Sequence, residues 1–279
     1  MKRSEKKNIL DLIENMRVLH KMLADSGEDL LTDYLSTCQQ AAISVGDILE
    51  KDSPDGLQDM ISTLEQYAEC CYEITVRGEC TADDVKRLDN LIDATVEKIE
   101  KLSVKIQVVF FPYKAEMWDS LESIYLAAAA DPGCEAKVIP IPYYEMDQTV
   151  GKWVLKYDGG HFPLGIPIEF YKEYNVKTEQ PDIAYIHNPY DNYNLVTSVH
   201  PDYYSFELKK YVGKLVYVPY YVNAGKLSNE HKNLPCYQHV DYIVLQSKQA
   251  KEDCRGIYCY DKILPLGSPK IDRVISFIL

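Results

Sequence analysis

The sequence lacks any segment that would carry the chain into or through a membrane. No run approaches the roughly 20 apolar residues that a membrane-spanning helix needs. The basic start, MKRSEKK, leads into an amphipathic stretch without a short apolar run or a small-residue cleavage site, which indicates no signal peptide. We therefore expect a cytoplasmic protein. Peripheral association with the inner face of the cell membrane stays open, although the acidic first half does not favour contact with anionic lipid.

An excess of positive charge is also missing. Thirty Lys and Arg residues stand against 43 Asp and Glu residues, which gives a formal net charge of −13 and a pI near 4.9. Nucleic acid would be repelled unless a local basic stripe existed, and the sequence contains none. We expect no nucleic-acid partner.

Several motifs of catalysis and cofactor binding are absent as well. There is no G-x-x-x-x-G-K-[ST] loop for ATP, no G-x-G-x-x-G dinucleotide turn after the first strand, no G-x-S-x-G elbow and no H-E-x-x-H pair. Of the eight cysteines, Cys70 and Cys71 are adjacent and Cys254 and Cys259 are five apart, with no histidine at a matching distance. We expect buried reduced thiols, no metal site and no cofactor.

What the sequence does contain divides it in two. Only three of the 23 tyrosines and one of the 14 prolines precede residue 106. This break in composition predicts a helical module over residues 1–104 and an α/β lobe over residues 105–279.

The first half has the three-four spacing of apolar residues that is typical of helices. Four stripes carry the pattern: Ile9, Ile13, Met16, His20 and Leu23; Leu31, Leu35, Cys38, Ala42, Val45 and Leu49; Leu57, Ile61, Leu64, Ala68 and Cys71; and Val85, Leu88, Ile92, Thr95, Ile99 and Leu102. Ser53-Pro54-Asp55 predicts the start of the third helix, and Thr81 with Asp84 predicts a capping box at the fourth. Short connections favour an antiparallel four-helix bundle, with His20 packed on its apolar side.

This bundle has two interpretations. It is either a self-contained bundle with an ordinary solvated face, which we favour, or a docking or dimerisation surface through apolar stripes that do not all face inward.

The second half alternates between strand and helix patterns. The expected strands are 105–111, 136–141, 182–186, 214–219, 241–246 and 262–266, and the expected helices are 117–130, 205–212 and 248–254. Residues 153–158 are expected to form a small extended ribbon, and residues 159–168 a loop. This order predicts a Rossmann-like lobe, in which helices cover both faces of a parallel sheet.

Ligands bind beyond the carboxyl ends of the strands in such sheets, so the loops that follow the strands hold the candidate site. They carry tyrosines and prolines, which give rigid, polar-tipped surfaces suited to sugar or polyol ligands. The candidate binding residues are Lys114, Trp118, Asp119, Asn188, Tyr190, Asp191, Tyr220, Ser268 and Lys270. His187 is our first candidate for a base and His200 our second, with a structural role bonded to the backbone as the alternative for either.

Lys270 follows Gly267-Ser268-Pro269 at the expected start of a helix. Backbone amides there, together with the ammonium group, are suited to hold a phosphate. The same residues are equally those of a simple turn before a capped helix.

Three blocks of these loops and strands resemble the N-terminal lobe of the CDP-glycerol glycerophosphotransferase family. They are VVFFPYKAEMWDSLESIYLAAAADPGCEAKVIPIPYYE, DIAYIHNPYDNYNLVTSVHPDYYSFELKKYVGKLVYVPYYV and LPLGSPKIDRV, in that order along residues 105–279. The family carries a Trp-His-Gly-Thr-Pro-type motif in this lobe, where this chain has Ile186-His187-Asn188-Pro189. The first hundred residues resemble the variable leader of some members.

The resemblance implies a two-lobed GT-B transferase that moves glycerol phosphate from CDP-glycerol to a hydroxyl of a teichoic-acid-like polymer. In that arrangement the N-terminal lobe presents a polyol-phosphate or sugar acceptor and the base, and the C-terminal lobe binds the donor nucleotide. On this interpretation the chain stops before the donor lobe, and we expect it to be inactive without that lobe or a partner chain that supplies it. The alternative is a non-catalytic binding or regulatory module with a helical docking domain.

Overall fold

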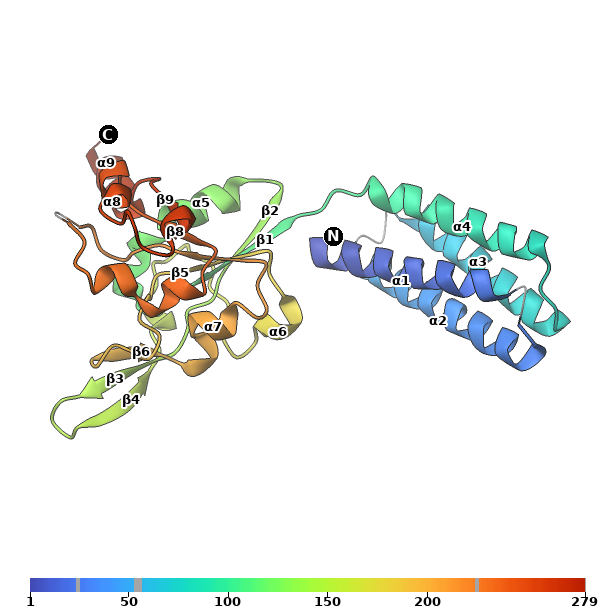
Figure 1. Ribbon diagram of the computed structural model, residues 1–279, viewed down its shortest axis with the longest axis horizontal. Helices are drawn as coiled ribbons and strands as arrows, with labels where there is room; N and C mark the ends of the chain where they lie inside the picture. Colours follow the sequence, from blue (N-terminus) through green and yellow to red (C-terminus); the bar gives the residue numbers. More distant parts are fainter. Residues whose placement is uncertain (24–25, 53–56, 224–225, 279) are drawn as a thin grey trace. The chain divides into compact units, whose positions relative to one another are not determined.

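A computed structural model describes residues 1–23, 26–52, 57–223 and 226–278 of the chain (Figure 1). The chain divides into two compact units, Met1–Lys105 and Ile106–Leu279. The first is helical and the second is a mixed α/β lobe, so the predicted fold class is confirmed. In the part of the chain that is described, no helix combines the length and the apolar character required to cross a bilayer.

The first unit is an up-and-down bundle of α1 (Arg3–Leu23), α2 (Glu28–Asp52), α3 (Gln58–Arg77) and α4 (Ala82–Glu100) (Figure 1). Its core is built from the predicted stripes, with Ile13, Leu35 and Ile92 among the side chains that are almost completely buried. The three-four spacing turns these side chains to one face of each helix, which is why the four helices share one apolar core.

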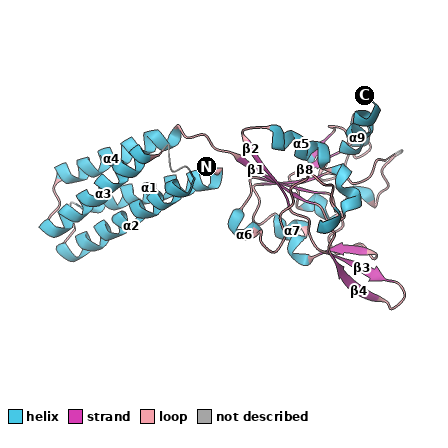
Figure 2. Cartoon of the chain, turned by 180° about the vertical axis from the view of Figure 1, so that it is seen from behind, coloured by secondary structure: helices cyan, strands magenta, loops and turns pink. Residues whose placement is uncertain are grey.

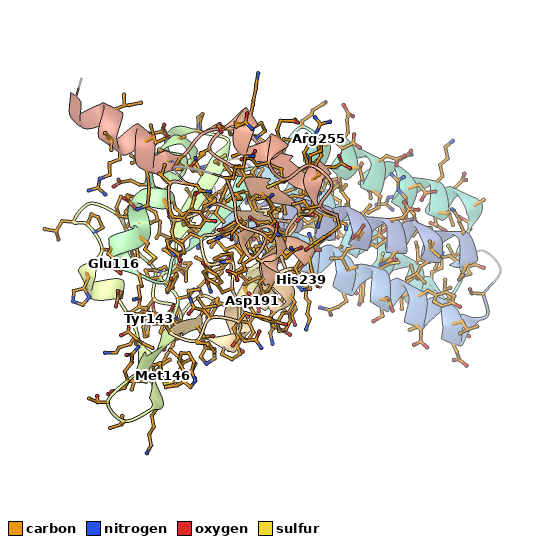
Figure 3. The ribbon with its side chains drawn as sticks, turned by 60° about the vertical axis from the view of Figure 1, so that its left-hand side comes forward. Glu116, Tyr143, Met146, Asp191, His239 and Arg255 are labelled. Atoms are coloured by element: carbon orange, nitrogen blue, oxygen red, sulfur yellow. The ribbon has the colours of Figure 1, made fainter. Side chains whose placement is uncertain are left out.

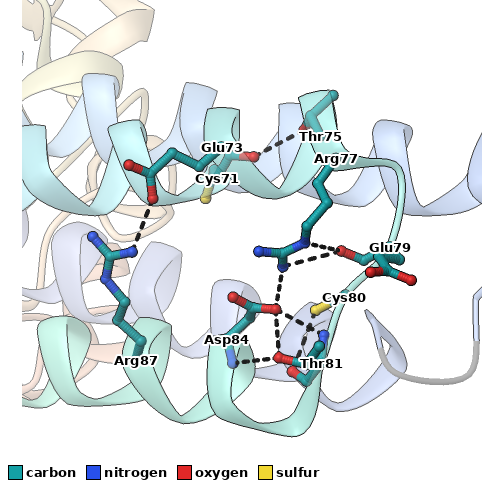
Figure 4. Close-up of polar contacts among 9 residues, drawn as sticks. All are labelled: Cys71, Glu73, Thr75, Arg77, Glu79, Cys80, Thr81, Asp84 and Arg87. Atoms are coloured by element: carbon teal, nitrogen blue, oxygen red, sulfur yellow. Dashed lines mark hydrogen bonds and ion pairs between the residues drawn. The ribbon is translucent and has the colours of Figure 1, made fainter.

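The cap predicted for α4 is present (Figure 4). The Asp84 N–H donates to Thr81 Oγ1 at 3.2 Å, and the Thr81 N–H donates to Asp84 Oδ2 at 2.8 Å. Asp84 also pairs with Arg77 at the end of α3, where Gly78 adopts a left-handed φ of 77°. These contacts stop one helix and start the next within four residues. The predicted start at Ser53-Pro54-Asp55 lies outside the described residues.

His20 is packed inside the bundle, as its pattern predicted. It is 1% exposed, with Nδ1 2.7 Å from Asp89 Oδ1 and Nε2 2.6 Å from the Tyr67 hydroxyl. The buried ring therefore has polar partners on both nitrogens and joins α1 to α3 and α4.

The second unit is built on a six-stranded parallel sheet in the order β2-β1-β5-β7-β8-β9 (Figure 2). The strands are β1 (Ile106–Phe111), β2 (Cys134–Val138), β5 (Ile183–Ile186), β7 (Lys214–Tyr217), β8 (Tyr242–Val244) and β9 (Ile263–Leu264). A strand is found in each expected place, one to three residues shorter than predicted, and the second begins at Cys134, two residues earlier than expected.

Alternate residues of the strands bury opposite faces of this sheet, as the two-residue repeat requires. One face packs against α7 (Ser205–Leu208) and α8 (Lys248–Glu252), and α6 (Val176–Glu179) lies near its edge. The other packs against a 3₁₀ turn (Ala115–Ser120) and α5 (Glu122–Ala130), which α9 (Pro269–Ile278) contacts. The single helix predicted over 117–130 is thus two pieces, since the chain changes direction at Leu121.

A second, three-stranded antiparallel sheet was only partly predicted. It consists of β3 (Tyr143–Asp147), β4 (Lys152–Lys156) and β6 (Thr197–Val199), in the order β4-β3-β6. The ribbon predicted over 153–158 is β4, whereas β3 and β6 were expected to be loops. The segment after β5 folds back and places β6 beside β3, which follows β2 in the chain. Such a contact joins residues more than 50 positions apart, so no local pattern reveals it.

Candidate functional site

The parallel sheet reverses its winding between β1 and β5. The chain moves outward from β1 to β2, crosses back to β5, and then proceeds through β7, β8 and β9 on the other side. Loops that leave the carboxyl ends of β1 and β5 diverge at such a point, which is where open α/β sheets bind ligands. The segments after these two strands, which start at Pro112 and His187, hold most of the predicted site residues.

His187 links the two loops instead of facing a ligand. Its Nε2 accepts the Tyr113 N–H at 3.1 Å, and its Nδ1 lies 3.0 Å from Ser120 Oγ, which donates to the Met117 carbonyl at 2.7 Å. The Tyr113 and Tyr220 rings contact the imidazole edge-on. The side chain is completely buried.

This environment keeps the imidazole neutral. Burial lowers the pKa of His187 to about 3, because a hydrogen bond with the Met117 backbone offsets only part of the cost of removing a charge from water. With both nitrogens engaged and no exposed edge, the ring offers no lone pair to a substrate hydroxyl. The prediction of His187 as the base does not fit this geometry, and the structural alternative does.

Lys114, after β1, lies among carboxylates. Its Nζ is 3.2 Å from Glu145 Oε1 and 3.9 Å from Glu116 Oε1, and it stands over the Tyr143 ring at 5.3 Å. Tyr143 lies at the base of the β3–β4 hairpin, and Met146 lies farther along it (Figure 3). The ammonium charge is therefore already compensated, and Lys114 joins the β1 loop to the small sheet.

Trp118 and Asp119 do not form a ligand surface together. Trp118 is 1% exposed and packs against Phe110, Tyr125 and Phe162 in the core. Asp119 accepts the Lys270 ammonium at 2.9 Å, an ion pair that ties the turn after β1 to the start of α9. Lys270 thus has a carboxylate partner where a phosphate had been predicted, and the expected binding role of Trp118 does not fit its burial.

The β5 loop is held by its own polar groups. Asn188 is nearly buried, and its Oδ1 accepts the Tyr190 N–H at 3.3 Å. Asp191, with a left-handed φ of 49°, accepts the Ser205 N–H and hydroxyl at 2.7 Å each (Figure 3 labels its position). Asn188 and Asp191 therefore shape the loop, whereas we predicted that they would bind substrate.

Tyr190 and Tyr220 are partly buried above His187, where burial and a hydrogen bond to Tyr190 raise the pKa of Tyr220. The phenol of Tyr220 stays neutral at any physiological pH. Of the predicted binding residues, Tyr190 and Tyr220 lie close enough for their hydroxyl groups to form a hydrogen bond with each other.

Ser268 lies at a separate pocket, at the carboxyl ends of β7, β8 and β9. Its carbonyl accepts the Ile271 N–H at 2.9 Å at the start of α9. Its buried hydroxyl has no hydrogen-bond partner among the described residues and lines this mainly apolar pocket with Tyr221 and Gln246. Gln246 is held in turn by Asn223, whose N–H donates to it at 2.8 Å.

His200 is the predicted base that retains access to solvent. It follows β6, its side chain is 31% exposed, and its ring stacks on Tyr144. Nδ1 lies 3.5 Å from Asp202 Oδ2. Nδ1 also accepts the Asp202 N–H at 3.4 Å, which leaves the proton of a neutral ring on Nε2. No described residue bonds Nε2, and transfer of that proton to Nδ1, beside the Asp202 carboxylate, makes Nε2 an acceptor for an incoming hydroxyl.

An open cavity of about 360 Å³ lies beside His200. Its wall contains Tyr171, Tyr174, Tyr203, Tyr211, Lys172 and Lys177 with Asp202 and Glu207. Lys172 and Lys177 stand over the Tyr171 and Tyr211 rings, at 5.9 and 5.5 Å. Flat aromatic walls with ammonium and hydroxyl groups between them suit a polyol or sugar that carries phosphate.

Sequence reasoning missed the residues of this wall. The segment 170–177, FYKEYNVK, interleaves aromatic and basic residues and could have indicated a binding surface. It carries no strand pattern and does not follow a strand of the parallel sheet, so a search confined to strand ends passed over it.

No family model matches the sequence, and no curated protein matches it at a significant level.

Proposed function

We propose that the α/β lobe presents the hydroxyl-bearing acceptor in a glycerol-phosphate transfer from CDP-glycerol. Two features support the proposal. The blocks that resemble the CDP-glycerol glycerophosphotransferase family cover β2, β5, β7, most of β1 and the last residue of β9, with the loops beyond the carboxyl ends of these strands. The cavity beside His200 combines aromatic walls with Lys172 and Lys177, the chemistry of a phosphorylated polyol site.

The observation that carries the proposal is the placement of His200. In the reaction, the acceptor oxygen forms a bond to the phosphorus that bears the glycerol, the bond from that phosphorus to CMP breaks, and the hydroxyl proton leaves. His200 Nε2 takes this proton, and the Asp202 carboxylate near Nδ1 stabilises the imidazolium that forms. The lysines of the cavity hold the phosphates of the acceptor chain.

A calorimetric titration with a synthetic tri(glycerol phosphate) tests acceptor binding. We expect Lys177→Ala to weaken binding about tenfold, or by about 1.4 kcal/mol. His161 is exposed and lies outside the cavity, so His161→Ala should leave binding unchanged. Absence of heat with the unaltered chain, or equal binding by the Lys177→Ala variant, would refute the proposal.

The alternative is a non-catalytic binding module with a helical docking domain. The burial of His187 and the pairing of Lys270 with Asp119 favour it, since both remove groups that were expected to act in chemistry. CMP release from CDP-glycerol and the acceptor separates the two functions. If the chain, assayed together with a lobe that binds CDP-glycerol, binds acceptor but releases no CMP above the level of a His200→Ala variant, the module is not catalytic.

A further inference from the structure

The helical bundle carries an open apolar groove between α2 and α3. Its floor is formed by Ala42, Ile61, Leu64 and Ala68, and Ile43, 47% exposed, stands on one side. The two helices that line the groove pack directly against each other. No part of this floor contributes to the site in the α/β lobe.

A row of apolar side chains extends from the groove along α3. Leu64, Ala68, Tyr72 and Val76 follow one another at intervals of four, the spacing that places side chains in one row on a helix. Tyr72 and Val76 are 62% and 68% exposed. From Leu64 to Val76 the row spans about 18 Å at 1.5 Å per residue, the length of a helix of three to four turns.

Gly46 deepens the groove. It lies in the middle of α2, where glycine is the least favourable residue after proline, yet an added Cβ would have no atom within 4 Å. A larger side chain would fit without a clash and would favour the helix. What the glycine provides is open space at the groove wall.

The rim of the groove is acidic. Asp47, Glu50 and Glu65 border it, all exposed, with no ion pair to another described residue and no basic residue in the lining. The surroundings have the same sign, because α2 and α3 together contain ten acidic and two basic residues. By contrast α1 has five basic and three acidic residues. The acidic charge is therefore concentrated on the two helices that form the groove.

We propose that this groove binds a basic amphipathic helix of a partner protein. The partner's apolar side chains, at positions i, i+3, i+4 and i+7, pack on the floor, and one enters the space beside Gly46. Its Lys or Arg side chains reach Asp47, Glu50 and Glu65. A second copy of this chain is a poor occupant of that site, since two such acidic faces would repel each other.

A synthetic Leu/Lys amphipathic peptide of about 14 residues, long enough to cover the row, serves as the probe. It is titrated into the full chain and followed by the peptide's fluorescent label. We expect Gly46→Leu to weaken binding at least about tenfold, although the unfolding midpoint in urea rises, since leucine favours the helix. Loss of binding in a better-folded protein cannot come from unfolding.

The charge contribution has a matched control. Asp47→Lys/Glu50→Lys and Asp11→Lys/Glu14→Lys make the same change in net charge at the same spacing, but the second pair lies on α1, away from the groove. We expect the first double variant to weaken binding of the Leu/Lys peptide about tenfold more than the second does. A Leu/Glu peptide of the same pattern should not bind.

Three results would overturn the proposal. They are undiminished binding by Gly46→Leu, an equal loss in the two double variants, and a concentration-dependent dimer in sedimentation that Gly46→Leu abolishes. The second would indicate general attraction between opposite charges, and the third would make the groove an interface between copies of the chain.

Discussion

The individual histidines of this chain differ mainly in how far they are removed from water. His187 is completely buried with both nitrogens bonded, whereas His200 keeps an exposed edge beside a polar cavity. The first belongs to the stability of the lobe and the second to its surface chemistry. Stability and ligand binding therefore test them separately.

Truncation of His187 should destabilise the α/β lobe. His187→Ala leaves the Tyr113 N–H and the Ser120 hydroxyl without their buried partner and opens a cavity, which together cost about 3 kcal/mol. Both tryptophans, Trp118 and Trp153, lie in this lobe, so tryptophan fluorescence in urea reports its unfolding alone. Because His161 is exposed, His161→Ala should change the free energy of unfolding by about 0.5 kcal/mol or less. Equal midpoints for the two variants would contradict the structural role of His187.

His187 should also make the lobe sensitive to acid. Its pKa is about 3 in the folded chain and about 6.5 in the unfolded one, so the unfolded state binds the extra proton between these values. Stability is then complete above about pH 6.5 and falls toward pH 3, by up to about 1.4 kcal/mol per pH unit. Urea titrations at several pH values measure the slope. It should become shallower in His187→Gln, and an unchanged slope would assign the acid sensitivity to other groups.

At the scale of elements, short contacts between the ends of helices and strands decide where each begins. The capping box of Thr81 and Asp84 starts α4 only three residues after Gly78 ends α3. In the lobe, Gly213 allows the chain to enter β7 against the backbone of Asp182.

Loss of the α4 cap should weaken the bundle. Thr81→Ala removes the hydroxyl that accepts the Asp84 N–H, at a cost of about 1 kcal/mol. Circular dichroism at the helical minimum follows the effect during urea unfolding. Thr81→Ser keeps the acceptor oxygen and should retain most of the stability, so an equal loss in both variants would show that the cap contributes nothing.

A side chain at Gly213 should disturb the pairing of β5 and β7. A Cβ there would meet the Asp182 carbonyl oxygen at 2.6 Å, well inside van der Waals contact, and backbone cannot move aside as a flexible side chain would. We expect Gly213→Ala to cost about 1–3 kcal/mol by tryptophan fluorescence. Gly160→Ala, with open space around the new Cβ, is the control and should be neutral. An unchanged free energy of unfolding in Gly213→Ala would show that the backbone before β7 can move away from Asp182 at no cost.

At the scale of the whole molecule, the described residues form three hydrophobic clusters that share no residue. One is built from Ile9 to Ile99 in the bundle, and the other two lie between Val108 and Ile263 in the lobe. The surface hollows differ in the same way. The groove of the bundle is bordered by acidic residues, whereas the cavity of the lobe is lined by tyrosines and two lysines. The proposed partner groove and the proposed ligand cavity thus lie on different units.

Separate cores predict separate unfolding transitions. Leu35→Ala creates a cavity in the bundle and should cost about 2–5 kcal/mol there. The midpoint by circular dichroism then falls, whereas the tryptophan fluorescence midpoint of the lobe stays in place. A parallel shift of both signals would mean that the two units unfold as one.

The sequence by itself determined the order and type of the main elements. Helical stripes, buried strand runs and the change of composition near residue 106 are local patterns, and backbone geometry converts them directly into a bundle and a parallel sheet. The capping box was readable for the same reason, because its partners are three residues apart.

Only the tertiary structure decided which of the candidate side chains stay open to solvent. The Tyr113 N–H reaches His187 across 74 residues and Lys270 meets Asp119 across 151, and these contacts buried a proposed base and paired a proposed phosphate-binding cation. The accessible cavity arose where β6 paired with β3 and set His200 beside the 170–177 segment. Burial and charge pairing depend on residues far apart in the chain, so no local pattern could have distinguished His187 from His200.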